Sequence, residues 1–450
     1  MDIKIDEIKK KLLTFGERVY KTIIRHGFDQ SGLTKSKIIF SNLFLHIHPV
    51  KVHRRSLMFK STLGLGVIAF VLFFILIVSG LLIMFHYVPS TIVGPDGFPD
   101  AYQRMLNLRS NVFWGTFIRN MHRWGAHAMC AIVALHMLRT FLTGSYRNGR
   151  EFNWVLGCIL GLLTILLSYT GYLLPWDQLA YWGVKVGTEI AKIAPGGDII
   201  RGLLLGDNEV GQEALLRFYV LHVAILPFVI SIVIALHFFR IRKDGGLARP
   251  ADTKHEKLIP HSEFGTVKNN SVFKSARSYK LVELVKDNAP KVNEEVDQMV
   301  FAWPKLITRE LILFMLVLAV MVIVSVLFNA ALEAPADPNH PTNPSKAPWY
   351  FLGLQELVSY HGFIGGVAIP GILVGLVTAA PYIEMFIETM FNIQRKIVGG
   401  VWFHRQRILE NSLFLTIFIS MLILIIIGTF FRGPNWAFIY PWDVPVSGGH

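Results

Sequence analysis

The sequence predicts an all-α integral membrane protein with about seven transmembrane helices, and three observations support that fold class. Of the 450 residues, 52% are hydrophobic and only 17% are charged, whereas soluble domains contain roughly 25% charged residues. Seven runs without Asp, Glu, Lys or Arg are long enough, or nearly so, to cross a bilayer as helices. Lys and Arg gather in alternate connections between these runs. The runs are roughly 61–87, 124–138 with its flanks, 152–174, 218–239, 311–332, 363–383 and 411–431.

The charge pattern orients the expected helices. Residues 1–60 contain thirteen Lys and Arg, residues 240–309 are similarly rich, and residues 331–362 contain only Lys346. Because cytoplasmic loops carry the excess of Lys and Arg, we expect the N-terminus and the segments 240–309 and 388–410 to be cytoplasmic. The net charge of +13 then reflects topology and does not indicate nucleic-acid binding.

This pattern divides the chain into four parts. A basic cytoplasmic segment precedes a four-helix bundle, and a charged cytoplasmic linker connects the bundle to a three-helix part. The only cysteines, Cys130 and Cys158, lie in apolar runs, so we expect no disulfide framework and no cysteine-ligated metal. The four parts are residues 1–60, 61–242, 243–300 and 301–450.

Four histidines in two of the runs form two matched pairs. His122 and His136 are fourteen residues apart, and His222 and His237 are fifteen apart. Fourteen steps of an α-helix return to within about 40° of the same face and fifteen to within about 60°, after roughly 21 Å of rise. Two such helices facing each other would offer one histidine pair at each of two membrane depths, and imidazole is a common axial ligand of haem iron. We interpret His127, five residues after His122, as structural.

A single membrane histidine could also be a proton relay or could bond to a neighbouring carbonyl. The matched spacing favours two haems, and glycines repeat the same spacing on two further helices. Glycine lets a bulky group approach the backbone, although small residues also serve helix packing in membranes. The pairs are Gly66 with Gly80 and Gly157 with Gly171.

Two arginines, Arg119 and Arg123, flank His122 at the outer end of its helix. Arginine pairs well with carboxylates, so these residues could hold haem propionates. They could equally anchor the helix end at the bilayer boundary.

Several of these segments resemble the cytochrome b/b6 family, that is, the cytochrome b subunits of quinol:cytochrome c oxidoreductases. The resemblance covers roughly residues 40–435. The fifteen-residue spacing and the 4+3 helix count resemble the split, photosynthetic branch, here with the two parts fused. The matching segments are Arg119–Tyr146, Gly171–Tyr181 (GYLLPWDQLAY), Arg217–Phe228, Phe301–Pro304 (FAWP), Ala334–Pro338 (APADP) and Pro348–Tyr350 (PWY).

The resemblance implies two b-type haems and a mechanism. His122 and His222 would hold the outer haem, and His136 and His237 the inner one. Quinol would be oxidised in an outer pocket formed by the loop after helix three and the PWY loop. One electron would pass to a Rieske iron–sulfur protein and the other across the haems to an inner quinone site, with protons released outside and taken up inside. It also implies a c-type cytochrome partner, a homodimer, and a multi-pass location in a bacterial inner membrane.

The sequence departs from the family in the outer pocket. The family commonly has Glu before the Trp-Tyr of this motif, where it takes a quinol proton, and this chain has Pro348. Tyr350 can accept a hydrogen bond, but its ordinary pKa makes it a poor net proton acceptor. We therefore expect Glu356 to accept the proton, with its pKa raised by burial. The alternative is that Glu356 only braces the loop, in which case Asp337 or Glu333 becomes the candidate.

Two further expectations concern the inner side. Arg242 resembles a family residue of the inner quinone site, and Glu310 is the nearest substitute for an acid that the family has after the FAWP motif. The split branch binds an extra haem covalently through a cysteine near the start of helix one, where this chain has Gly64, so we expect no covalent haem. A rival interpretation is a di-haem membrane anchor that delivers electrons without oxidising quinol at an outer site, and another is a transporter with a histidine proton relay.

Overall fold

The computed structural model describes residues 2–23, 51–147, 149–243, 299–393 and 400–442. Seven of its helices are long and apolar enough to cross a membrane, as the sequence predicted. Most of the expected linker 243–300 lies outside the described residues. The seven spans are α4 (Leu65–Met84), α6 (Gly115–Leu142), α7 (Glu151–Tyr172), α10 (Gln212–Val220) continued by η3 (Leu221–Ile225) and α11 (Leu226–Lys243), α13 (Ala302–Leu327), η6 (Ile364–Ala368) with α15 (Ile369–Met390), and η7 (Arg405–Arg407) with α16 (Ile408–Phe430).

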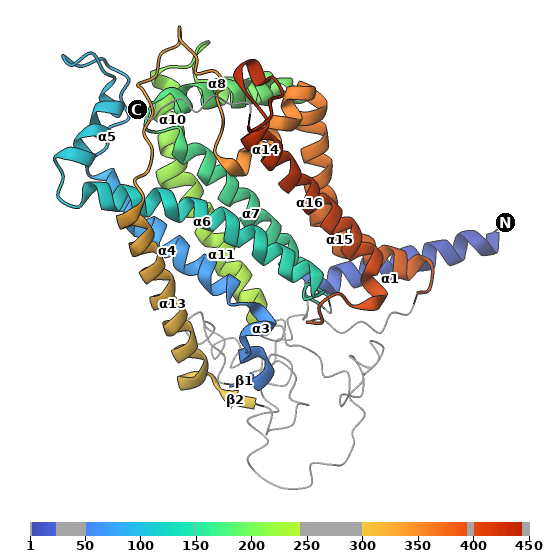
Figure 1. Cartoon of the computed structure of the whole chain (residues 1–450). Coiled ribbons are helices and arrows are strands. Elements are labelled where there is room, and N and C mark those ends of the chain that lie inside the picture. The colour runs from blue at the N-terminus through green and yellow to red at the C-terminus, as the bar shows by residue number, and fades with distance from the viewer. Residues whose placement is uncertain (1, 24–50, 148, 244–298, 394–399, 443–450) are drawn as a thin grey trace, which may run out of the picture.

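The first four spans form a bundle, and the last three flank it. In the bundle α4 packs on α6, α6 on α7, and α7 on α11, while α13 packs against α4 and α6. Helix α15 packs against α7, and α16 packs against α14 (Trp349–Tyr360) and α6. Figure 1 shows α13 on one side of the bundle and α15 and α16 on the other.

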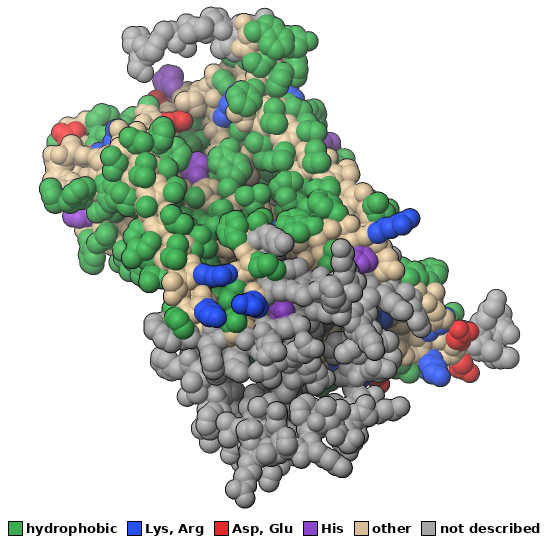
Figure 2. Space-filling model, turned by 60° about the horizontal axis from the view of Figure 1, so that its bottom comes forward, with side chains coloured by type: hydrophobic (Ala, Val, Ile, Leu, Met, Phe, Trp, Pro, Cys, Tyr) green, Lys and Arg blue, Asp and Glu red, His purple; other side chains and the backbone are tan. Residues whose placement is uncertain are grey.

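The outward faces of these helices are apolar. On α13 the side chains of Leu311, Ile312, Met315 and Leu316 are each more than half exposed, as expected for side chains that contact lipid. Figure 2 shows hydrophobic side chains across one face of the molecule and a group of Lys and Arg side chains along the lower border of that face, with a few others at its edges. The protein is therefore a multi-pass membrane protein.

A short sheet marks one end of the bundle. β1 (Lys51–His53) pairs antiparallel with β2 (Met299–Phe301), with Val52 opposite Val300. β2 directly precedes the fifth span, and only two short helical turns separate β1 from the first span, so those two spans enter the membrane from the same side. The shorter helical elements nearby are η2 (Arg54–Leu57) and α3 (Phe59–Thr62).

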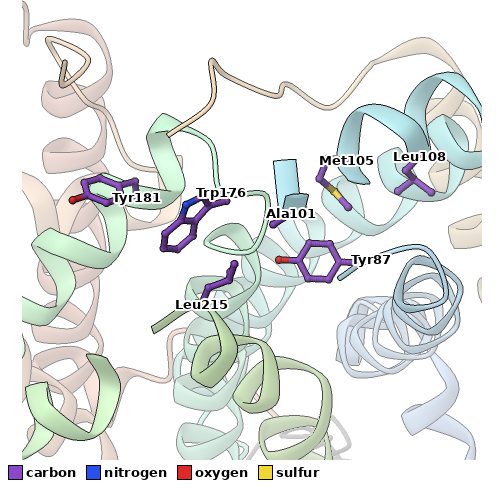
Figure 3. Close-up of a cluster of buried hydrophobic side chains, with 7 residues drawn as sticks. All are labelled: Tyr87, Ala101, Met105, Leu108, Trp176, Tyr181 and Leu215. Atoms are coloured by element: carbon purple, nitrogen blue, oxygen red, sulfur yellow. The ribbon is translucent and has the colours of Figure 1, made fainter. Parts of the chain in front are cut away.

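At the opposite end, α5 (Asp100–Ser110), α8 (Gln178–Ile193), α9 (Gly197–Leu205) and α14 cover the bundle (Figure 1). A buried hydrophobic cluster joins the segment after α4 to α5, to the turn before α8, and to α10 (Figure 3). Nearby, the Tyr87 hydroxyl donates a hydrogen bond of 2.6 Å to the Leu174 carbonyl. The cluster consists of Tyr87, Ala101, Met105, Leu108, Trp176, Tyr181 and Leu215.

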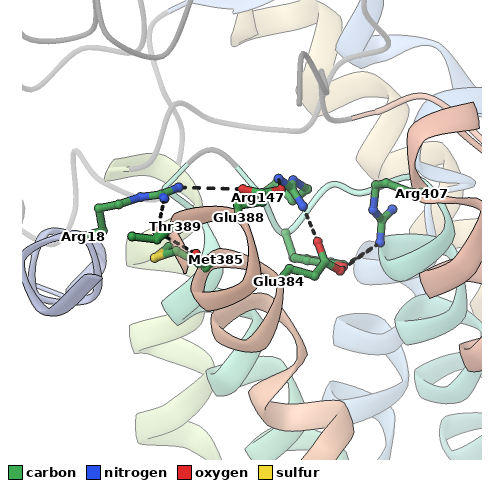
Figure 4. Close-up of polar contacts among 8 residues, drawn as sticks. Arg18, Arg147, Glu384, Met385, Glu388, Thr389 and Arg407 are labelled. Atoms are coloured by element: carbon green, nitrogen blue, oxygen red, sulfur yellow. Dashed lines mark hydrogen bonds and ion pairs between the residues drawn. The ribbon is translucent and has the colours of Figure 1, made fainter. Parts of the chain in front are cut away.

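At the end where α15 finishes, a network of charged side chains connects α1 (Asp2–Ile23), the loop before α7 and the C-terminal helices (Figure 4). Arg147 forms ion pairs with Glu384 and with Glu388 at 2.5 Å, and Arg407 lies 3.6 Å from Glu384. Arg18 of α1 donates a hydrogen bond of 2.6 Å to Thr389. Although burial alone would lower it, Glu384 and Glu388 raise the pKa of Arg147 above its ordinary value, so this residue stays charged.

Candidate functional site

The two outer histidines face each other across the bundle from α6 and the π-turn η3. The ring centroids of His122 and His222 are 6.1 Å apart, and their planes are at 81°. A metal ion held at about 2 Å from one nitrogen of each ring requires a centroid separation of roughly 6 Å. These residues therefore fit bis-imidazole coordination of one iron.

The π-turn accounts for the unequal spacing of the histidines. His222 lies within η3, where the backbone bonds run from residue i to i+5, so the turn holds one residue more than an α-turn. The fifteen-residue spacing of His222 and His237 thus covers about the same length along the helix axis as the fourteen-residue spacing of His122 and His136. The offset of about 60° expected for a regular α-helix is reduced to that of the shorter spacing.

Each predicted glycine lies against one histidine. A methyl group at Gly171 would lie 2.5 Å from Cε1 of His222, and one at Gly80 would lie 3.0 Å from Cε1 of His122. At the inner pair, a methyl group at Gly66 would lie 3.4 Å from Cε1 of His136, and one at Gly157 would lie 3.7 Å from Cε1 of His237. The glycines therefore give the imidazoles room at two depths. The four pairs are Gly80 with His122, Gly171 with His222, Gly66 with His136 and Gly157 with His237.

The sequence interpretation missed two hydroxyl residues beside the outer histidines. Ser79 Oγ lies 3.0 Å from Nδ1 of His122, and Thr170 Oγ1 lies 3.2 Å from Nδ1 of His222. Each hydroxyl residue immediately precedes one of the glycines, which is a signal that the sequence does contain.

The two arginines before and after His122 differ in their surroundings. Arg119 is buried and donates hydrogen bonds of 2.6 and 2.7 Å to the carbonyls of Ala330 and Ala331. This arrangement favours the interpretation of Arg119 as a brace over that of a propionate ligand. Among the described residues, Arg123 has no hydrogen-bond partner, and its charge acts on Tyr350 and Asp177.

The PWY segment packs against α6 of the four-helix bundle. Pro348 precedes the first residue of α14, and Trp349 Nε1 donates a hydrogen bond of 3.0 Å to Nδ1 of His127. The rings of His127 and Tyr350 are 5.4 Å apart. His127 therefore connects the bundle to the C-terminal part. This contact is the structural role that the sequence led us to expect for His127.

The end of α7 reaches the same place. The rings of Tyr172 and Phe351 are 5.8 Å apart. Burial raises the pKa of Tyr350 to about 12, although the Arg123 charge acts in the opposite direction. The Asp177 carboxylate caps α8 by accepting a hydrogen bond of 2.9 Å from the Ala180 amide. Residues of two distant segments, the end of α7 and the start of α14, thus lie together.

The expectation that burial raises the pKa of Glu356 is wrong. Its side chain is fully buried, but Arg432 Nη2 lies 2.5 Å from Oε1, and the hydroxyl of Tyr360 and Nε1 of Trp436 donate hydrogen bonds of 2.8 and 2.9 Å. Although burial alone would raise it, these donors lower the pKa of Glu356 below its ordinary value. A carboxylate held in this way is a poor proton acceptor, so the bracing interpretation is the better one.

Two other carboxylates, near the start of α8, have pKa values shifted in the opposite direction. Burial raises the pKa of Asp177, and burial together with the Asp177 charge raises the pKa of Glu333. The Glu333 amide donates a hydrogen bond of 3.2 Å to Asp177 Oδ2. The Asp337 side chain, in contrast, is exposed to solvent. Hydrogen bonds from Asn339 and His340 lower its pKa.

Two residues were expected on the inner side. Arg242 belongs to the last turn of α11, and its side chain lies outside the described residues, as does most of the following linker. Glu310 lies on α13 and is partly buried.

Comparisons of sequence and structure find similarity to cytochrome b proteins and to a respiratory Complex III. The sequence profile described as "Cytochrome b(N-terminal)/b6/petB" matches residues 127–335. The chain is 40% identical to cytochrome b6 of Gracilaria tenuistipitata var. liui over 183 residues, which are 40% of this chain and 81% of that protein. It is 30% identical to the cytochrome bc complex cytochrome b subunit of Chlorobaculum thiosulfatiphilum over 334 residues, 74% of this chain and 67% of that one. A solved structure titled "Hyperthermophilic respiratory Complex III" is similar with a TM-score of 0.63 and 25% identity, over 88% of both chains.

Proposed function

Because the chain belongs to the cytochrome b/b6 family and is a haem-binding cytochrome b subunit of a bc-type complex, we propose that it oxidises quinol at its outer face. Electrons would cross the membrane through two b-type haems to an inner quinone site, and this transfer would be coupled to proton translocation. When bound, the haems supply reversible one-electron transfer. The residues proposed to hold them are His122 with His222 and His136 with His237.

One observation carries this proposal: the 6.1 Å separation of the His122 and His222 rings, each lying against a glycine. The contact between Trp349 and His127 supports an outer quinol pocket over a simple di-haem anchor, because it joins the PWY segment to the bundle near the outer histidines. We place the quinol between Tyr350 and the loop after α7, where the Tyr350 hydroxyl would bond to a quinol oxygen.

Quinol oxidation releases protons, so a base must lie within reach of the bound quinol. We propose that Asp177 and Glu333 take this role in place of Glu356. Their raised pKa values suit proton uptake better than the lowered pKa of an ion-paired carboxylate. Arg123, whose charge acts on both carboxylates, would tune them.

The proposed partners are a Rieske iron–sulfur protein, a c-type cytochrome and a second copy of the chain in a dimer. The proposed location is a bacterial inner membrane with the N-terminus in the cytoplasm, consistent with thirteen Lys and Arg in residues 1–60. The inner quinone site would lie near Arg242.

The test is the haem content and activity of the purified complex. We expect two b-type haems for each copy of this chain, both low-spin, and reduction of cytochrome c by quinol. Two haems without quinol-dependent reduction of cytochrome c would favour the di-haem anchor, and a chain without haem would refute the proposal.

A further inference from the structure

The outer and inner histidines have different neighbours. At both outer positions the residue before the glycine carries a hydroxyl, and this hydroxyl lies within 3.0 to 3.2 Å of the histidine Nδ1. At both inner positions the corresponding residue is leucine, Leu65 or Leu156. Among the described residues, Nδ1 of His136 is buried with no hydrogen-bond partner. The two sites therefore share their glycines but not the hydroxyls beside the histidines.

The direction of the hydrogen bond at His122 follows from the helix geometry. Ser79 Oγ donates its hydrogen to the Ile75 carbonyl at 2.7 Å, as hydroxyl residues inside helices often do. Its oxygen can then only accept from His122, so the hydrogen of the neutral imidazole lies on Nδ1. This tautomer leaves the lone pair of Nε2 available for a metal.

The same argument applies independently at His222. Thr170 Oγ1 donates to the Leu166 carbonyl at 3.0 Å and lies 3.2 Å from Nδ1 of His222. The Leu167 carbonyl, which can only accept, lies 3.1 Å from the same nitrogen. Two acceptors thus fix the hydrogen on Nδ1.

We propose that Ser79 and Thr170 are positioning residues that hold the outer histidines in the metal-binding tautomer and lower the reduction potential of the outer haem. An acceptor on the remote N–H of a ligating histidine fixes the ring and raises the basicity of the ligand. A more basic ligand favours ferric over ferrous iron, so the midpoint potential falls. The inner haem lacks these hydroxyls and is not affected. This inference rests on the proposed two-haem function.

The experiment is a redox titration of the haem absorbance in the purified haem-loaded complex, together with electron paramagnetic resonance of the ferric low-spin signals. The variants are Ser79→Ala and Thr170→Val, which remove the hydroxyls with little change in volume. We expect the midpoint of the outer haem to rise in each variant by up to about 59 mV, which is a tenfold change for a one-electron couple. The midpoint of the inner haem should not change. A protein with His136→Ala, which retains only the outer haem, assigns the signals.

Two further variants separate hydrogen bonding from packing. Ser79→Thr keeps the hydroxyl and should retain the wild-type midpoint. Leu156→Thr introduces a hydroxyl beside the inner haem and should lower only the inner midpoint. The inference is wrong if Ser79→Ala and Thr170→Val change neither the midpoint nor the resonance signals of the outer haem, or if both haems shift together. A wild-type complex without two bis-histidine haems would instead refute the proposed function.

Discussion

Removing the charge partner of Glu356 should destabilise the outer end of the C-terminal part. Glu356 is fully buried, and the Arg432 side chain that neutralises it is 13% exposed. Truncating one partner of such a pair leaves an uncompensated buried charge, which costs about 3–5 kcal/mol. We expect Arg432→Met to lie near the lower limit, about 3 kcal/mol, because Tyr360 and Trp436 still donate to the carboxylate. Glu356→Gln keeps an acceptor for these donors and should cost about 1–3 kcal/mol.

The assay is thermal loss of the haem absorbance in detergent, with Arg104→Met as the matched control. Arg104 and Asp100 form an ion pair with side chains 45% and 32% exposed, so its loss should cost at most about 1 kcal/mol. An Arg432→Met protein as stable as the control would refute the bracing role.

The pH dependence of stability gives a second readout of the same pair. Because the pKa of Glu356 is lower in the folded protein than its ordinary value, the unfolded chain takes up the proton first as the pH falls. The stabilisation is therefore complete above the unfolded-state pKa, about 4.3, and is lost as the pH falls through the folded-state pKa. The Glu356→Gln protein should lose less stability over this acid range.

Activity distinguishes the bracing role from the catalytic one. At neutral pH and with its haems intact, the Glu356→Gln protein should retain most of its quinol oxidation. A loss of about 10²-fold with the acidic limb of the pH profile abolished would show instead that Glu356 is a general base.

Three other predictions concern the haems. His122→Ala should remove the outer haem and His136→Ala the inner one; optical spectra that still show two bis-histidine haems would contradict the assignment. Gly171→Ala should impair the outer haem more than Gly157→Ala impairs the inner, because the added methyl would lie 2.5 Å from Cε1 of its histidine in the first case and 3.7 Å in the second; haem content of the purified proteins measures this, and equal losses would count against it. No covalent haem should occur, since Gly64, which has no thiol, stands where the split branch has its haem-binding cysteine; a peroxidase-stained band at the mass of this chain on a denaturing gel would disprove this.

The parts that could be predicted from the sequence depend on local pattern. Apolar length identified the seven spans, and spacing identified the histidine and glycine pairs, because a helix converts residue number into position. The environment of Glu356 could not be predicted in this way. Its partner Arg432 is 76 residues away, and no periodicity connects α14 to the segment after α16.

The role of His127 shows a similar limit. Its place on α6 could be predicted, but its bond to Trp349 spans 222 residues and depends on how the two parts pack. Ser79 and Thr170 each immediately precede a glycine that the spacing did identify, so the sequence next to those glycines already contained this signal.

The π-turn at His222 has a consequence for how such sequences diverge. Two sites at fixed depths set the length of a helix in ångströms, whereas the number of residues between them depends on the winding of the helix. One span uses fourteen residues and the other fifteen, with the extra residue in η3. A single-residue insertion or deletion can thus be absorbed within one turn while both ends keep their neighbours. Residue count between ligands is therefore free to drift by one among relatives, and an alignment that forbids gaps inside membrane helices would misplace one of the two histidines on that helix.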